Sequence, residues 1–354
     1  MVSKRIQKAL EGNSAIRAMF NEGREMAAKY GEENVFDFSL GNPATPAPKA
    51  LNDAIRDLLD EADAKGAAGS LGIHGYMANA GYEEVRQAIA ENLNERFETK
   101  FTAHNLVMTV GAAGGLNIIF KTMLDPDDEV IVFAPFFGEY RQYAANFDAK
   151  IVIVQPNLET FQPDLADLEA KITARTKALI VNTPNNPTGV IYKPQTMEQI
   201  GAILEKKQAE FGTDIYLISD EPYRELVYDG NKEDFLTKYY RNTLVGYSFS
   251  KSLSLPGERI GYVVVPDEAA DAEELIRGIE ISNRTLGFVN APSLIQKAVA
   301  RCLEEKTDVT FYDENRSRLY EGLTKLGFTC IKPEGAFYPV SYTHLRAHET
   351  VLDL

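Results

Sequence analysis

The sequence has little of what membrane, secreted and metal-binding proteins need. Its two cysteines, Cys302 and Cys330, stand far apart and belong to no pairing motif, which is typical of the reducing cytoplasm. No apolar run is long enough to cross a bilayer. The first twenty residues have the charged, amphipathic pattern of a helix and lack the apolar stretch of a signal peptide. We therefore expect a soluble, cytoplasmic protein without a membrane partner.

Positive charge is also scarce. The chain of 354 residues has 37 lysines and arginines against 52 aspartates and glutamates, for a formal net charge of -15. Such a charge repels a phosphate backbone, so we expect no nucleic-acid partner. An anionic small molecule could still bind in a pocket that gathers local positive charge. The length fits two domains, or one large domain with a smaller lobe.

Strand-length apolar runs alternate with helical patterns through the middle of the chain. The expected strands are Leu106–Val110, Glu129–Ala134, Lys150–Gln155, Ala178–Val181, Ile215–Ser219, Thr243–Tyr247 and Gly261–Val265. Helical periodicity is expected at Lys49–Ala62, Gly81–Phe97, Gly114–Met123 and Thr196–Phe211, and over most of Asp271–Leu326. This alternation predicts an α/β domain with a mostly parallel, doubly wound sheet between layers of helices.

Four of these apolar runs end abruptly in small or polar residues. VMTV is followed by GAAGG, ALIV by NTPNNPTG, IYLIS by DEPY and LVGY by SFSK. In an open α/β sheet, ligands bind outside the carboxyl ends of the strands. Any one of these segments could be an ordinary turn, but together they predict one shared crevice.

Two charged side chains in these segments suggest chemistry. Lys251 follows a buried strand among small hydroxyl residues, and Arg259 comes eight positions later. A nearby cation favours the neutral, nucleophilic amine. Asp220 ends an apolar run, where a buried carboxylate needs a cationic partner such as a protonated ring nitrogen. A solvated surface lysine and a helix-capping aspartate are the ordinary alternatives.

Two loops complete the pattern. The segment Asn182–Gly189 is stiffened by two prolines, and its asparagine amides can donate to a ligand oxygen. The segment Gly111–Gly115 joins a strand to a helix, where backbone N–H groups can bind an anion. It lacks the dinucleotide-binding fingerprint, and either loop alone could be purely structural.

Taken in order, the motifs resemble those of the class I/II aminotransferases of pyridoxal-5'-phosphate (PLP) fold type I. The resemblance runs from about Leu40 to Val340 through Gly-Asn-Pro, Tyr-x4-Gly, GAAGG, PFFGEY, NTPNNPTG, SDEPY, SFSKSLSLPGERIGY and GAFY. It implies a mixed, mostly parallel sheet sandwiched by helices, and a smaller α+β domain built from both termini. The implied divisions are an N-terminal segment of the small domain at 1–47, a large PLP-binding domain at 48–270 and a partial small domain at 271–340.

The resemblance also implies a role for individual residues. Lys251 becomes the lysine that holds PLP as a Schiff base, and Asp220 pairs with its pyridine nitrogen. Tyr223 and Asn186 then bind its phenolic oxygen, and Phe137 covers the pyridine face unless it is simply a core residue. Residues expected to hold the phosphate are Ser248, Ser250, Arg259 and the backbone amides of Ala112 and Ala113.

Two further residues point to the partners. By the resemblance, Tyr76 reaches the phosphate of a neighbouring subunit, which implies a homodimer, and Gly41 lies beside the substrate carboxylate. The implied reaction moves an amino group between an L-amino acid and a 2-oxo acid, with Lys251 moving the Cα proton. The alternatives are another PLP reaction, such as C–S lysis or decarboxylation, and a non-catalytic PLP-binding regulator domain.

The pattern departs from the family after Val340. Residues 341–354 are expected to be a non-native tail, so the arginine that pairs with the substrate carboxylate in the family is expected to be missing and turnover to be weak. Arg346 could stand in for that arginine. His344 and His348 have the spacing of a metal pair on a helix, but solvated tail residues are the expectation, and no metal site is predicted.

Overall fold

The computed structural model describes residues 2–11, 15–36, 41–232 and 234–342. Its contacts divide the chain into two compact units, Met1–Ala44 and Thr45–Leu354. The first unit contains α1 (Lys4–Glu11), α2 (Ala15–Tyr30) and the short η1 (Glu32–Asn34). The second unit contains all the strands of the described residues and every other helix.

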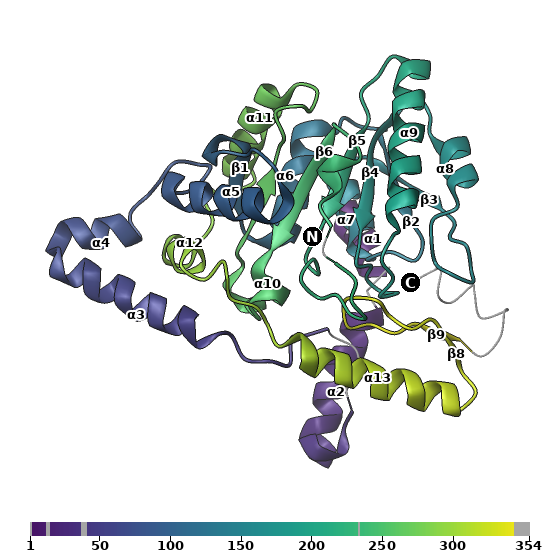
Figure 1. The fold of residues 1–354 in the computed structure, drawn as a ribbon, viewed down its shortest axis with the longest axis horizontal. Helices are drawn as coiled ribbons and strands as arrows, with labels where there is room; N and C mark the ends of the chain where they lie inside the picture. The colour runs from purple at the N-terminus through teal and green to yellow at the C-terminus, as the bar shows by residue number, and fades with distance from the viewer. Residues whose placement is uncertain (1, 12–14, 37–40, 233, 343–354) are drawn as a thin grey trace. The chain divides into compact units, whose positions relative to one another are not determined.

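A seven-stranded sheet is the centre of the second unit (Figure 1). Its strands are β1 (Leu106–Thr109), β2 (Glu129–Phe133), β3 (Lys150–Val154), β4 (Thr176–Asn182), β5 (Tyr216–Asp220), β6 (Thr243–Ser248) and β7 (Gly261–Val264). They lie in the order β1-β7-β6-β5-β4-β2-β3. Only β7 is antiparallel to its neighbours, so the predicted mixed, mostly parallel sheet is confirmed.

The helices of this unit follow the predicted pattern closely. They are α3 (Lys49–Ala64), α4 (Gly66–His74), α5 (Glu83–Phe97), α6 (Gly111–Met123), α7 (Glu139–Ala145), α8 (Leu165–Lys171), α9 (Pro194–Phe211), α10 (Phe249–Ser252), α11 (Ala272–Thr285), α12 (Ser293–Ala300) and α13 (Val309–Lys325). Short 3-10 turns η2 (Ala103–Asn105), η3 (Leu236–Lys238) and η4 (Pro256–Glu258) lie between them. Helix α6 begins three residues earlier than its periodicity predicts, because its first turn starts at Gly111 and includes the small residues of the GAAGG segment.

Helices cover both faces of the sheet. Along β2, Val130 and Val132 pack in one core cluster and Ile131 and Phe133 in another, because successive side chains of a strand point to opposite faces. Helices α6, α7 and α11 contribute to the first cluster, and α8 and α9 to the second. Apart from the edge strand β3, which is only partly buried, the strands are therefore buried on both faces, and this explains why they are continuous apolar runs and not alternating ones.

The register brings the ends of four strands to one edge. Asn182 of β4 pairs with Asp220 of β5, which pairs with Gly246 of β6. Two residues later, Ser248 pairs with Gly261 at the start of β7, which pairs with Thr109 at the end of β1. The four strand ends that carry small and polar residues thus lie at one edge of the sheet, as predicted.

The C-terminal segment forms a small hairpin in which β8 (Thr329–Cys330) pairs with β9 (Ser341–Tyr342). The boundary predicted between residues 270 and 271 divides no separate unit here, since contacts join both sides in the second unit. The division of residues 48–340 into large and small domains therefore stays a prediction. Within the described residues, no helix is long and apolar enough to cross a membrane.

Candidate active site

Lys251 lies in α10, the single helical turn that follows β6 at the edge where the four polar strand ends meet. The turn forms because the Ser248 hydroxyl caps it, accepting from the backbone N–H of Ser250 at 3.2 Å. Burial, with help from the charge of Arg259, lowers the pKa of Lys251 from 10.5 to about 8. A substantial fraction of the amine is therefore neutral near physiological pH, as a nucleophile or a base requires.

Asp220 ends β5 and is 5% exposed. The Tyr140 hydroxyl of α7 donates to its Oδ2 at 2.5 Å, while its Oδ1 is buried without a hydrogen-bond partner among the described residues. Burial raises the pKa of Asp220 from 3.8 to about 7, against the opposing effect of the Tyr140 hydrogen bond. A buried acceptor without a partner is costly, so this oxygen marks a position for a ligand donor.

Tyr223 and Asn186 lie together, as the sequence predicts. The Asn186 side-chain amide donates to the Tyr223 hydroxyl at 3.3 Å. Asn182 organises this corner, since its amide donates to the Asp220 carbonyl at 2.8 Å and its Oδ1 accepts from the Asn186 backbone at 2.7 Å. The Tyr338 hydroxyl lies 3.1 Å from the Tyr223 hydroxyl. Two loops and the C-terminal segment thus converge on one phenol.

The start of α6 and Arg259 form a cationic corner. Gly111 has a φ of 76°, and a Cβ there would lie 2.9 Å from the Arg259 guanidinium, so glycine lets the two approach. Arg259 itself donates to the carbonyls of Pro256 at 2.9 Å and Val110 at 3.4 Å. Ala112 and Ala113 follow at the first turn of α6, whose N–H groups have no partner within the helix. This corner can hold a dianionic phosphate.

The remaining predicted residues have different settings. Phe137 is half-buried and packs edge-to-face on Tyr140, with ring centroids 5.6 Å apart. It therefore lies next to the tyrosine that donates to Asp220. Ser250 is buried, and its hydroxyl is 2.7 Å from that of Ser248. Tyr76 follows α4 and is 97% exposed, and Gly41 belongs to the first unit. The roles predicted for Tyr76 and Gly41 therefore stay predictions.

Three residues at the site have no individual role that the sequence predicts. Tyr140 and Tyr338 are the last letters of the motifs PFFGEY and GAFY, and Asn182 is the first of NTPNNPTG. Each motif is part of the family resemblance, but only the sheet register and loop packing show which side chain meets Asp220 or Tyr223. His344, Arg346 and His348 lie outside the described residues, and no cluster of metal-ligating side chains occurs in the ranges that are described.

The three-layer α/β domain, the lysine with a lowered pKa, the unsatisfied buried aspartate and the anion corner at one sheet edge fit the needs of a PLP enzyme of fold type I. The sequence model of the family described as "Aminotransferase class I and II" matches residues 33–352. The chain therefore belongs to this family of PLP-dependent aminotransferases. The match includes residues 341–352, and the predicted non-native origin of residues 341–354 stays a prediction.

Named relatives agree with this family. An aspartate aminotransferase of Thermotoga maritima is 29% identical, over 96% of this chain and 84% of that protein. A probable aspartate/prephenate aminotransferase of Aquifex aeolicus is 32% identical, over 90% of this chain and 77% of that protein. The crystal structure of an amino transferase from Eubacterium rectale is 48% identical with a TM-score of 0.90, covering 96% of this chain and 85% of that one.

Proposed function

We propose that Lys251 is the residue through which this aminotransferase binds PLP covalently and moves the proton at the substrate Cα. The observation that carries this is a lysine with a pKa of about 8 at the same sheet edge as a buried carboxylate with one oxygen left for a ligand. With this pKa, the amine can release and take up a proton in turn near neutral pH, as a base and then an acid must. The net result would be transfer of an amino group from an L-amino acid to a 2-oxo acid.

PLP, when bound, supplies a ring that accepts the electron pair released at Cα. The chain's own residues would hold that ring. The free oxygen of Asp220 would accept from the pyridine N–H, and this cation would pull the pKa of Asp220 back down from its raised value. Tyr223 and Asn186 would bind the phenolic oxygen, and Phe137 would cover the ring face. The hydroxyls of Ser248 and Ser250, Arg259 and the amides of Ala112 and Ala113 would hold the phosphate.

Solvent exchange of a labelled substrate tests the role of Lys251. The wild-type protein, loaded with PLP, should replace deuterium at the Cα of the substrate with protium from water. Lys251→Ala should not catalyse this exchange, although the labelled amino acid and PLP are both supplied. Arg284→Ala, on the surface of α11, serves as the control for removal of a cationic side chain elsewhere. Exchange that persists in Lys251→Ala at the wild-type rate would show that another group moves the proton.

We propose aspartate, an acidic amino acid, as the amino donor and a 2-oxo acid such as prephenate as the acceptor, because the relatives of this chain are named for aspartate and prephenate. Purified protein should be assayed with aspartate, alanine, cystathionine and aromatic amino acids, with and without 2-oxoglutarate. Amino transfer requires the oxo acid and produces glutamate. Ammonia released without the oxo acid would instead indicate a lyase.

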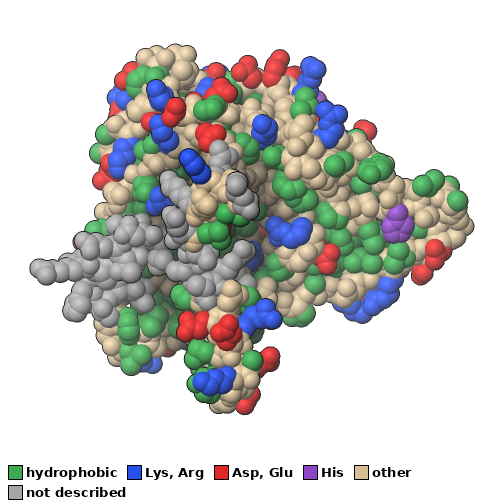
Figure 2. Space-filling model, turned by 180° about the vertical axis from the view of Figure 1, so that it is seen from behind, with side chains coloured by type: hydrophobic (Ala, Val, Ile, Leu, Met, Phe, Trp, Pro, Cys, Tyr) green, Lys and Arg blue, Asp and Glu red, His purple; other side chains and the backbone are tan. Residues whose placement is uncertain are grey.

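We also propose a homodimer whose subunits share sites. Helices α3 and α4 form a hairpin that reaches away from the sheet (Figure 1), and the surface over this region gathers hydrophobic side chains (Figure 2). Leu71 in α4 is 71% exposed and Tyr76 just beyond it is 97% exposed, so both are available to a second copy. Mixing inactive Tyr76→Ala and Lys251→Ala proteins should restore activity in hybrid dimers. A monomer by ultracentrifugation would contradict this proposal.

A cytoplasmic location is part of the same proposal. It is supported by Cys302 and Cys330, which are both free cysteines, since thiols persist in a reducing compartment. Fractionation of expressing cells, with activity followed in each fraction, tests it.

A further inference from the structure

The segment Glu334–Tyr338 is bound to the Asn186 loop by main-chain hydrogen bonds. The backbone N–H groups of Glu334 and Gly335 both donate to the Gly189 carbonyl, at 2.8 and 2.9 Å. Close packing requires glycine here, since a Cβ on Gly335 would lie 2.6 Å from Pro184. One residue further on, Ala336 donates to the Leu226 carbonyl at 2.9 Å.

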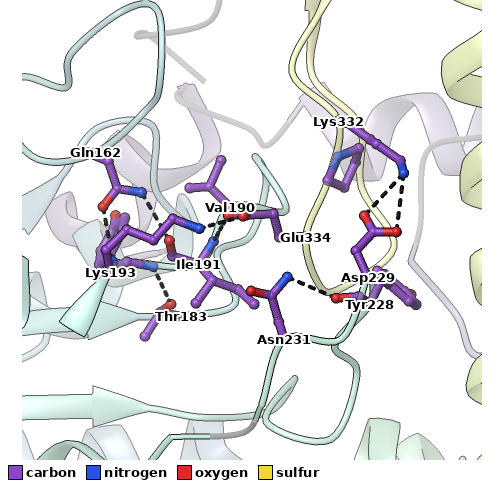
Figure 3. A network of polar contacts seen from close by, with 12 residues as sticks. Gln162, Thr183, Val190, Ile191, Lys193, Tyr228, Asp229, Asn231, Lys332 and Glu334 are labelled. Atoms are coloured by element: carbon purple, nitrogen blue, oxygen red, sulfur yellow. Dashed lines mark hydrogen bonds and ion pairs between the residues drawn. The ribbon is translucent and has the colours of Figure 1, made fainter.

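Side chains fix the same segment. Glu334 forms an ion pair with Lys193 and accepts from the Ile191 N–H at 3.3 Å (Figure 3). On the other side of the segment, Lys332 pairs with Asp229 at 3.1 Å (Figure 3). The segment is therefore tied on both sides to the loops that carry Asn186 and Tyr223.

This attachment places two aromatic rings against the proposed catalytic groups. The Phe337 ring lies 5.4 Å from the Lys251 Nζ and packs edge-to-face on Tyr223, with centroids 5.7 Å apart. Tyr338 also packs edge-to-face on Tyr223 at 5.7 Å, and the two hydroxyl oxygens are 3.1 Å apart. The Tyr223 oxygen thus has Asn186 and Tyr338 as its neighbours.

The hydrogens of these hydroxyls decide what Tyr223 offers to a ligand, and either hydroxyl can donate to the other. The Asn186 amide can only donate to the Tyr223 oxygen, so one further donor leaves the hydrogen of Tyr223 free for a ligand. Burial raises the pKa of both phenols, so both hydroxyls keep their hydrogens near neutral pH.

We propose that Tyr338 is a positioning residue that donates to the Tyr223 oxygen and so directs the Tyr223 hydroxyl hydrogen to the phenolic oxygen of PLP. This inference rests on the proposed function, in which Lys251 and Tyr223 contact the cofactor. Hydrogen bonds in a chain strengthen one another, so Tyr338 makes Tyr223 a stronger donor. A stronger donor at the phenolic oxygen competes with the nitrogen that joins Lys251 to PLP, and therefore lowers the pKa of that nitrogen.

Removal of one oxygen atom tests the proposal. The pH at which the absorption band of bound PLP changes should be measured for the full chain and for Tyr338→Phe. We expect the midpoint to rise by about 0.5 pH unit, a fraction of one hydrogen bond transmitted through Tyr223. Tyr312→Phe is the matched control, because Tyr312 stacks on Phe337 at 5.2 Å but its hydroxyl bonds to Thr45. Its midpoint should equal that of the wild type.

Each other result overturns the proposal. A lower midpoint in Tyr338→Phe would mean that Tyr223 donates to Tyr338, and an unchanged midpoint would mean that Tyr338 only fills space. Fluorotyrosine at position 338 is a more acidic donor and should lower the midpoint, which keeps the test available if Tyr338→Phe fails to fold. A wild-type protein without any absorption change on adding PLP would refute the Lys251 assignment itself, and this inference with it.

Discussion

Replacement of Asp220 with asparagine should change the stability of the PLP-free protein in a pH-dependent way. The pKa of Asp220 is about 7 in the folded chain and 3.8 when its surroundings are removed. Between about pH 4 and 7, Asp220 is therefore protonated in the folded state and ionised in the unfolded state. Because the folded pKa is raised, the wild type loses stability as pH rises through this window, and the loss is complete above about pH 7.

The size of this loss follows from the two pKa values. At 1.36 kcal/mol per pKa unit, the charged form of Asp220 costs about 4 kcal/mol of unfolding free energy at pH 8, of which about 1.7 kcal/mol is already present at pH 5. The amide introduced by Asp220→Asn does not ionise, and any fixed cost of burying it is the same at both pH values. The stability difference between Asp220→Asn and the wild type should therefore grow by about 2.5 kcal/mol from pH 5 to pH 8.

Urea unfolding of both proteins without PLP, at pH 5 and pH 8, measures this difference. Asp229→Asn is the control with the opposite sign. Asp229 accepts from Arg316 at 2.8 and 3.0 Å, and these hydrogen bonds lower the pKa of Asp229. Removal of its carboxylate charge in Asp229→Asn should therefore destabilise the protein at neutral pH. A stability difference for Asp220→Asn that does not change with pH would refute the raised pKa. With PLP, the same variant should lose roughly 10²- to 10⁴-fold in rate, since breaking a buried charged pair costs roughly 3–5 kcal/mol.

Three further predictions concern groups around this site. Tyr140→Phe removes the hydrogen bond that lowers the pKa of Asp220, so the Kd for PLP should rise by roughly tenfold. A fluorescence titration at pH 8 measures this, with Tyr216→Phe as the control because the Tyr216 hydroxyl donates to the Ala270 carbonyl instead. Arg259→Met removes the cation that lowers the pKa of Lys251, so the midpoint of Lys251 acylation without PLP should move above 8; an unchanged midpoint would leave burial as the sole cause. Gly111→Ala should weaken phosphate binding, because its Cβ would displace Arg259; a wild-type PLP affinity would contradict the close approach.

The sheet could be predicted from the sequence because parallel strands buried on both faces leave unbroken apolar runs. The seven expected runs correspond to β1–β7, with ends shifted by a residue or two. Strand order could not be predicted in this way. The antiparallel β7 between β1 and β6 leaves no mark on its own sequence, yet its pairing aligns Thr109 with Ser248 and so brings the anion corner to Lys251.

The site could be predicted in its named residues but not in its supports. Lys251, Asp220 and Asn186 stand in segments whose small and proline-rich neighbours distinguish them from ordinary turns. Tyr140 has no such neighbours, and its contact with Asp220 spans 80 positions, so only packing reveals it. Tyr338 lies 115 positions from Tyr223, and it reaches that phenol only because Gly189 and Gly335 let two backbones approach.

Chemical trapping of the cofactor tests the central claim most directly. The 354-residue chain should be incubated with PLP, reduced with borohydride and digested, and the modified lysine identified by mass spectrometry. We predict the pyridoxyl mass on Lys251, with no modification at this position when PLP is omitted. A label on other lysines with Lys251 unmodified, or an absorption band of bound PLP that persists in Lys251→Ala, would contradict the account.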